Sequence, residues 1–163
     1  MTFKELFLES FDSSYQVIKK EQIQNVQRFY LEHFNDKIYR IYFEKVDDII
    51  SIGFERYIDK WFISGLTNDL TSKEVLQLFG TIKVLLKEQS FNGIFITSQE
   101  VNKSNLYFNM INKLNKEYKW SVSRDDDSIY MVNPSLEFDE KETKKGTKYY
   151  FKSNKWHLKT FYT

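Results

Sequence analysis

The sequence predicts a mixed α+β (α/β) domain, in which a mostly antiparallel sheet holds a central βαβ unit and carries packed helices. Residues 25–57 alternate apolar and polar side chains with period two, which is typical of antiparallel strands with one buried face. Residues 61–114 read as a short strand, a polar loop, an amphipathic helix, an apolar strand and a second helix. Residues 120–123 and 129–132 then predict a hairpin that closes the sheet.

Composition limits the classes of protein to which the chain can belong. With 163 residues, of which 41% are hydrophobic and 29% charged, it fits one folded domain with a buried core. It has no Cys, which excludes disulfides, thiolate metal sites and cysteine nucleophiles. It also has no Ala, and its abundant Lys, Asn, Ile, Phe and Tyr indicate an AT-rich coding sequence.

The N-terminal segment, residues 1–12, does not look like a targeting signal. Glu5 and Glu9 interrupt its short apolar set, and no window approaches the roughly 20 apolar residues of a membrane span. Residues 3–10 instead predict a short amphipathic helix that Thr2 caps. We therefore expect a cytoplasmic protein that does not contact a membrane.

Three strands are expected before residue 58. The odd-numbered residues of 39–43 and the even-numbered residues of 50–54 are apolar, so each set should face the core. A less regular strand precedes them at about 26–34. The polar pairs 35–36 and 47–48 are expected to turn the chain between strands.

The middle of the chain predicts the βαβ unit. A fourth strand at residues 61–64 leads through a polar loop into a helix that Thr71 should cap, with Glu74 completing a capping box. The nearly all-apolar run at 93–97 is typical of a central strand that is covered on both faces. A strand, a helix and a further strand in this order make a crossover that is right-handed in nearly all proteins.

The composition changes after Pro134. Residues 141–163 carry seven Lys and one Glu, a net charge of +6, whereas the rest of the chain carries 17 basic and 22 acidic residues, a net charge of −5. We therefore divide the chain into a domain at residues 1–133 and a basic C-terminal appendage at residues 134–163. Such a charge difference suits a nucleic acid, an acidic partner or a neighbouring copy.

Within the appendage, the charged residues 136–147 predict a linker, and residues 148–151 and 155–161 predict a hairpin that turns at 153–154. Basic and aromatic side chains alternate here, as they do in surfaces that bind single-stranded nucleic acid. The chain has only four Arg, however, which favours a protein partner or self-association over nucleic acid. The candidate partner-binding residues are Lys148, Tyr150, Lys152, Lys155, Trp156 and Lys159.

The order of elements in residues 25–133 resembles the acetyltransferase fold of the GNAT superfamily. A narrower resemblance is to a family of small, uncharacterised phage proteins with a GNAT-like fold. It is carried by the stretches MTFKELFLES, FERYIDKWFISGLTND, FGTIKVLLKE and NKSNLYFNMINKL. This second resemblance implies a viral protein, located in the cytoplasm of the host cell or in the virion, and it brings no established activity with it.

The acetyltransferase resemblance implies acetyl-CoA as a cofactor, with its pyrophosphate on the loop that enters the first long helix. Backbone N–H groups and the helix dipole favour an anion there, and Gly65, Thr71 and Ser72 are the residues in that place. The family's loop usually carries Gln or Arg, then Gly, then Gly or Ala, whereas residues 64–72 have one Gly and no Arg or Gln. Asp69 would repel a phosphate, so we favour a capped loop without a ligand.

The same resemblance implies a general acid on the second helix, which is expected at about residues 103–114. Acetyltransferases often carry an Asn near the start of this helix and a Tyr about seven residues later, and here Asn102 precedes Tyr107 by five. A Tyr near its normal pKa serves as an acid if the leaving thiolate is within reach. Tyr107 also lies on the apolar stripe of the helix, so we favour a core role. Glu44 and Glu55 are candidates for the base.

No metal site is expected. His33 and His157 lie far apart in the sequence, and a zinc site needs three or four ligands. Residues 125–127 are three Asp that offer oxygen ligands to a hard cation. We favour a solvated hairpin turn for them.

Three hypotheses for function remain. We favour a non-catalytic GNAT-like module without a cofactor, which has a binding or structural role in a virion or against a host protein. The alternative is an acetyl-CoA-dependent N-acetyltransferase with Tyr107 as its acid. The third hypothesis is a nucleic-acid-binding protein that uses the basic appendage.

Overall fold

The computed structural model describes residues 13–46, 48–97, 101–124, 128–135, 138–144, 146–151 and 161–162. These residues form a mixed α+β protein with a mostly antiparallel sheet and two helices. The predicted helix at 3–10, the acidic turn at 125–127 and the predicted turn at 153–154 lie outside the described residues. In the part of the chain that is described, neither helix is long and apolar enough to cross a membrane.

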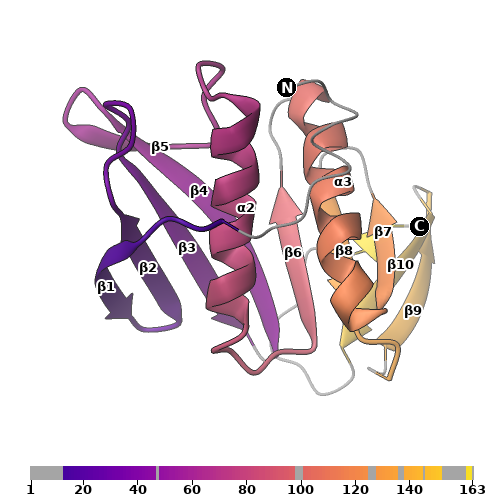
Figure 1. The fold of residues 1–163 in the computed structure, drawn as a ribbon. Coiled ribbons are helices and arrows are strands. Elements are labelled where there is room, and N and C mark those ends of the chain that lie inside the picture. Colours follow the sequence, from indigo (N-terminus) through magenta and orange to yellow (C-terminus); the bar gives the residue numbers. More distant parts are fainter. Residues whose placement is uncertain are drawn as a thin grey trace. The chain divides into compact units, whose positions relative to one another are not determined.

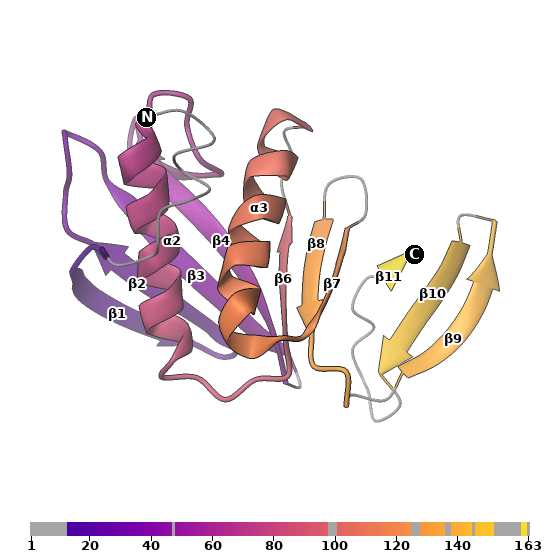
Figure 2. The same ribbon diagram turned by 45° about the vertical axis from the view of Figure 1, so that its right-hand side comes forward.

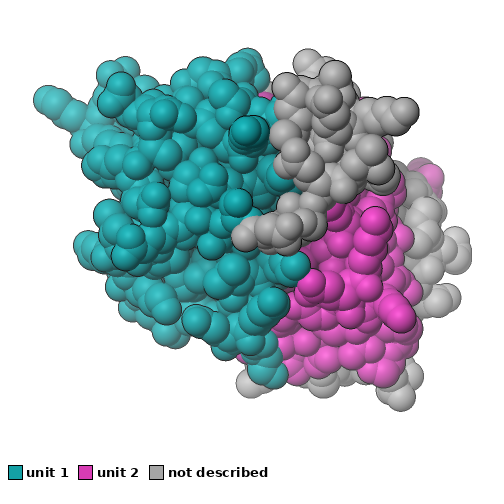
Figure 3. Space-filling view, viewed as in Figure 1, with its two compact units in different colours: residues 1–44, 51–90 teal, residues 45–50, 91–163 magenta. Residues whose placement is uncertain are grey.

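The chain divides into two compact units (Figure 3). Unit 1 comprises residues 1–44 and 51–90, and unit 2 comprises residues 45–50 and 91–163. The strands of the first half are β1 (Val17–Ile23), β2 (Val26–Leu31), β3 (Tyr39–Val46), β4 (Ile49–Ile58) and β5 (Trp61–Ser64), and the helix α2 (Ser72–Leu86) follows them. The second half contains β6 (Gly93–Thr97), α3 (Val101–Tyr118), β7 (Ser121–Arg124), β8 (Ser128–Val132), β9 (Phe138–Thr143), β10 (Gly146–Phe151) and β11 (Phe161–Tyr162).

Unit 1 is an antiparallel sheet with α2 across one face (Figure 1). The strand order is β1-β2-β3-β4, and β5 pairs with β4. The predicted alternation is confirmed, because Ile41 and Phe43 on β3 and Ile52 on β4 are buried. α2 is buried around most of its circumference, since leucines widen its apolar stripe, and Phe79 packs edge-on against Phe54 with ring centroids 5.3 Å apart.

Two tight turns shape this sheet. Asn35 and Asp36 have φ of 47° and 60°, the left-handed conformation that short polar side chains tolerate, so the predicted turn is confirmed. Asp59 and Lys60, with φ of 50° and 75°, join β4 to β5. The expectation that residues 61–64 start a βαβ unit therefore needs correction, because this strand is the second arm of an antiparallel hairpin with β4.

The sequence patterns did not predict β1. Its burial alternates poorly, with Lys19 and Lys20 both exposed, and its register with β2 shifts between Val17 and Lys19. In the strand order it is an edge strand, where lysines and bulges limit pairing with other chains. A strand without a continuous buried face leaves no period-two signal in the sequence.

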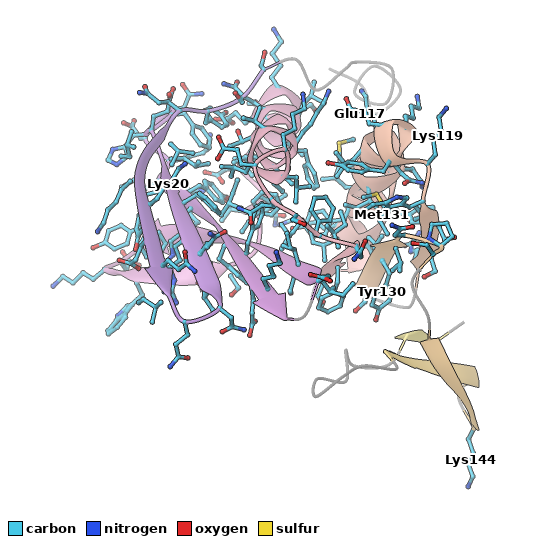
Figure 4. All side chains as sticks on the ribbon, turned by 90° about the horizontal axis from the view of Figure 1, so that it is seen from below. Lys20, Glu117, Lys119, Tyr130, Met131 and Lys144 are labelled. Atoms are coloured by element: carbon cyan, nitrogen blue, oxygen red, sulfur yellow. The ribbon has the colours of Figure 1, made fainter. Side chains whose placement is uncertain are left out.

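Unit 2 has a second group of strands with α3 packed on β8 and β7 (Figures 1 and 2). β8 pairs antiparallel with both β6 and β7, so the predicted closing hairpin is confirmed. α3 runs four residues past the predicted Leu114, until Lys119 takes a φ of 57°. The Asn115 side chain holds this end by bonding the backbone N–H and carbonyl of Trp120 at 2.8 and 2.7 Å. Glu117 and Lys119 lie near this end (Figure 4).

The appendage forms a three-stranded sheet in the order β11-β10-β9. β11 pairs antiparallel with β10, with Phe161 opposite Tyr149, whereas residues 155–160 of the predicted second arm lie outside the described residues. The linker predicted at 136–147 is wrong, because residues 138–143 form β9 and pair along the whole of β10. Consecutive charged residues at 139–142 interrupt any period-two pattern in the sequence of β9, and Lys144 projects at the turn to β10 (Figure 4).

Candidate functional site

The candidate site is the stretch between β5 and α2, residues 65–71, which we call the entry loop. Gly65 begins it with a φ of 104°, which an L side chain rarely adopts, and its N–H donates to the carbonyl of Phe54 at 2.8 Å. The next side chain, Leu66, is buried. The first two residues therefore fasten the loop to β4 and to the core of unit 1.

Tyr39, on β3, holds the middle of the loop. Its hydroxyl accepts the backbone N–H of Thr67 at 2.9 Å and lies 2.7 Å from the Thr67 hydroxyl. The Tyr39 side chain is fully buried, so its hydroxyl is directed at this position by the packing of the core. One loop N–H that an anion would otherwise approach is thus already bonded to a neutral hydroxyl.

A basic side chain does reach the entry loop, although the loop itself contains none. The Arg56 guanidinium, on β4, donates to Thr67 and forms an ion pair with Asp69. The hydroxyl of Thr67 and the charge of Arg56 both lower the pKa of Asp69 below its ordinary value. Arg56 follows the buried residues 50, 52 and 54 on the same face of β4, so the period-two pattern contained a signal for it.

The capping box at the start of α2 is confirmed. Thr71 is the N-cap, and its hydroxyl accepts the N–H of Glu74 at 3.1 Å. The Glu74 carboxylate in turn accepts the N–H of Thr71 at 2.8 Å. Two of the N–H groups that are free at a helix N-terminus are therefore bonded within the chain.

Glu74 is more than a cap, because its carboxylate is buried against a positive charge. The Lys37 ammonium lies 3.0 and 3.1 Å from its two oxygens, and the Asn35 amide donates at 3.1 Å. Glu74 is 4% exposed and Lys37 8% exposed. Burial alone would raise the pKa of Glu74, but the bonds from Thr71, Lys37 and Asn35 outweigh it and lower that pKa. No local pattern in the sequence predicts this pair, because its members are 37 positions apart.

The helix N-terminus thus already faces an anion that belongs to the chain. A helix dipole favours negative charge at this end, and the Glu74 carboxylate occupies that role with its own buried counter-ion. A phosphate brought to the entry loop would meet two carboxylates, Glu74 and Asp69, and would compete for N–H groups that are already bonded. These bonds hold the entry loop to β3 and to the start of α2.

The structure locates the predicted cofactor-binding residues in unit 1 and the predicted catalytic residues in unit 2. Gly65 starts the loop, Thr71 caps α2 and Ser72 is its first residue, all in unit 1. Asn102 and Tyr107 are both on α3, in unit 2. Tyr107 is 3% exposed and shares the buried side of α3 with three other residues, Met110, Ile111 and Leu114, as the core interpretation expects.

The two candidates for a general base differ in their surroundings. Glu55, on β4, accepts a hydrogen bond from Arg40 Nε at 2.8 Å, and both side chains are largely buried in this ion pair. Glu44 lies half-buried on β3, on the same face of the sheet. The bond from Arg40 engages Oε1 of Glu55 and stabilises the ionised carboxylate.

The candidate partner-binding residues fall in two groups. Lys148 and Tyr150 belong to β10, where their backbones pair with Lys141 and Asp139 of β9. The other four lie outside the described residues, namely Lys152, Lys155, Trp156 and Lys159. In the described part of the chain no three His, Asp or Glu side chains gather to hold a metal ion.

Comparison with protein-family models, with curated proteins and with solved structures finds no match for this chain.

Proposed function

We propose that the chain is a GNAT-like module that does not use acetyl-CoA and acts by binding another macromolecule. The observation that carries this proposal is the Glu74 carboxylate, held at the start of α2 by Lys37, Asn35 and the Thr71 N–H. An acetyltransferase would use the same helix N-terminus for pyrophosphate. A chain that fills this place with its own anion has no need of a ligand there.

The order of elements supports the GNAT-like assignment. Antiparallel strands precede α2, and a strand, a helix and an antiparallel pair follow it. Within unit 2, the N–H of Asn92, just before β6, donates to the carbonyl of Asp48, just before β4, at 2.6 Å. β4 and β6 therefore start side by side, as the two strands joined through the helix of a GNAT-like βαβ unit do.

The hairpin between β4 and β5 supports the absence of a cofactor. A cofactor arm lying along a strand needs the free backbone groups of that edge. Residues 55–58 of β4 are paired instead with residues 61–64 of the chain itself. Together with the bonds of the entry loop, this pairing supports a module that does not use acetyl-CoA.

Isothermal titration of the full chain with acetyl-CoA tests this proposal. We expect no saturable heat at ligand concentrations up to about 1 mM, which corresponds to a binding free energy weaker than about −4 kcal/mol. Micromolar binding would sink the proposal and favour the N-acetyltransferase alternative. In that case Tyr107→Phe should abolish acetyl transfer without abolishing binding.

We also propose that the appendage binds a protein partner, because its basic residues contrast with the acidic remainder of the chain. The chain would act in a phage-infected cell or in the virion. Replacing Lys148, Lys152, Lys155 and Lys159 with Glu together should abolish co-purification of the partner from infected cells. Salt-sensitive retention on DNA that these changes remove would favour the nucleic-acid alternative instead.

A further inference from the structure

The sheet of unit 1 has one face that α2 does not cover, which we call the outer face. Its side chains alternate along each strand with the buried residues that face α2. No helix in the described part of unit 1 lies over it, and side chains project from the side of the sheet away from α2 (Figure 4). Four aromatic residues lie on this face: Tyr30, Tyr42, Tyr57 and Phe62.

The outer face is ordered around Arg40. Its guanidinium donates to Glu55 at 2.8 Å and to the hydroxyl of Tyr30 at 3.0 Å, and its Cζ lies 3.7 Å from the centroid of the Phe62 ring. Tyr57 packs against Phe62 with ring centroids 5.3 Å apart. Because these side chains hold one another in place, a partner would lose little side-chain entropy by binding them.

The Tyr42 ring lies close over Gly53 at the centre of the outer face. A Cβ atom at Gly53 would collide with the ring of Tyr42, so this ring lies over the β4 backbone instead of standing away from the sheet. A glycine inside a strand weakens it, and one accepted reason is the close approach of another group. Two sheets pack face to face when their side chains interdigitate, and a ring that lies over the backbone does not obstruct such packing.

The charge on this face favours a copy of the same chain as partner. Three basic and three acidic side chains share it: Lys19, Arg28 and Arg40 with Glu21, Glu44 and Glu55. Arg28 pairs with Glu21 at 3.6 Å and Arg40 with Glu55 at 2.8 Å, so the face carries no net charge. A nucleic acid gains no net attraction from such a face, and an identical face that docks by two-fold symmetry meets no net repulsion.

The size of the face is sufficient. Five strands at about 4.8 Å spacing and six residues at about 3.3 Å rise give about 24 by 20 Å, or about 500 Å² for each copy. Two copies would bury about 1,000 Å², the area at which a specific interface becomes plausible. Tyr and Arg are the residues most enriched at such interfaces.

We propose that the outer face binds the same face of a second copy, so that the chain forms a two-fold symmetric dimer by packing sheet on sheet. The outer face shares no residue with the entry loop or the appendage. A chain that does not dimerise would therefore still be able to lack acetyl-CoA binding and to bind a partner through its appendage.

Sedimentation velocity of the full chain tests the dimer. We expect a mass of twice 19.8 kDa at concentrations of tens of micromolar and dissociation on dilution. Tyr57→Glu, at a position that is 40% exposed on the outer face, should weaken the dimer at least about tenfold. Ile63→Glu is the matched control, because Ile63 is 50% exposed on the same hairpin but faces the α2 side. It should leave the dimer unchanged.

Far-UV circular dichroism establishes that both variants are folded. A wild-type chain that stays monomeric at 100 μM overturns the proposal. So does a dimer that Ile63→Glu weakens as much as Tyr57→Glu, or one that neither change affects. The proposal is also overturned if the wild-type chain is a monomer that binds a single-stranded oligonucleotide and the Tyr57→Glu variant does not bind it. That result would assign the outer face to nucleic acid.

Discussion

Replacing Lys37 with Met removes the positive partner of a carboxylate that is buried at the start of α2. The ammonium lies 3.0 and 3.1 Å from the two oxygens of Glu74, and after the change the carboxylate keeps the Asn35 amide and the Thr71 N–H as donors. Breaking a buried ion pair by removing one partner costs about 3–5 kcal/mol, because the other charge stays desolvated. Since two donors remain, we expect the lower end, about 3 kcal/mol.

The reverse change, Glu74→Gln, leaves the Lys37 ammonium buried without an anion and should cost a similar amount. The double variant carries neither charge, so its cost should fall below the sum of the two by at least about 2 kcal/mol. Urea unfolding of the full chain, followed by circular dichroism, measures these values. For a chain of this size, a loss of about 3 kcal/mol lowers the Tm by about 6–12 °C.

The matched control is Lys73→Met, which removes an exposed Lys from the adjacent position of α2. It should change the free energy of unfolding by less than about 0.5 kcal/mol. The reasoning is refuted if Lys37→Met costs no more than this control, or if the costs of Lys37→Met and Glu74→Gln simply add in the double variant. Either result would mean that the charges of Lys37 and Glu74 do not form a buried, desolvated ion pair.

Three further predictions concern neighbouring features. Thr71→Ala removes the N-cap and should cost about 0.5–2 kcal/mol in urea unfolding, whereas Thr71→Ser, which keeps the hydroxyl, should cost little; equal losses would contradict the cap. Gly53→Ala should cost about 1–3 kcal/mol by displacing the Tyr42 ring, and Tyr42→Ala in the same chain should recover part of the loss; no recovery would place the strain elsewhere. The pKa of Glu74 lies below its ordinary 4.5, so the stabilisation is present above about pH 5 and is lost as the pH falls through the native pKa. The urea midpoint of Glu74→Gln should therefore depend less on pH between 6 and 3, and an unchanged slope would refute this assignment.

The sequence predicted those features whose signal is local. The capping box needs only Thr71 and Glu74, three positions apart, and both bonds are present. Strands with one buried face, such as residues 39–46, show a period-two pattern of apolar residues in the sequence itself. The residue types at 35–36 predict the turn, because few side chains tolerate a positive φ.

The features that the sequence did not predict depend on contacts between distant residues. Lys37 and Glu74 are 37 positions apart, and nothing near Lys37 distinguishes it from an exposed lysine. β1 and β9 have charged residues where a strand pattern would need apolar ones, so only their pairing with β2 and β10 defines them. The period-two pattern could have placed Arg56 on the core side of the sheet, because it continues the buried face of β4.

The most direct test of the occupied helix N-terminus is an NMR titration of the full, ¹⁵N-labelled chain with acetyl-CoA and, separately, with inorganic pyrophosphate. The backbone amides of Thr67, Thr71 and Glu74 report on the place where a phosphate would bind. Because these N–H groups are bonded to Tyr39, Glu74 and Thr71, we predict no saturable shift of their signals at ligand concentrations up to about 1 mM. Saturable shifts that centre on these three amides would contradict the account, since they would show that the chain gives up its internal bonds to hold a phosphate.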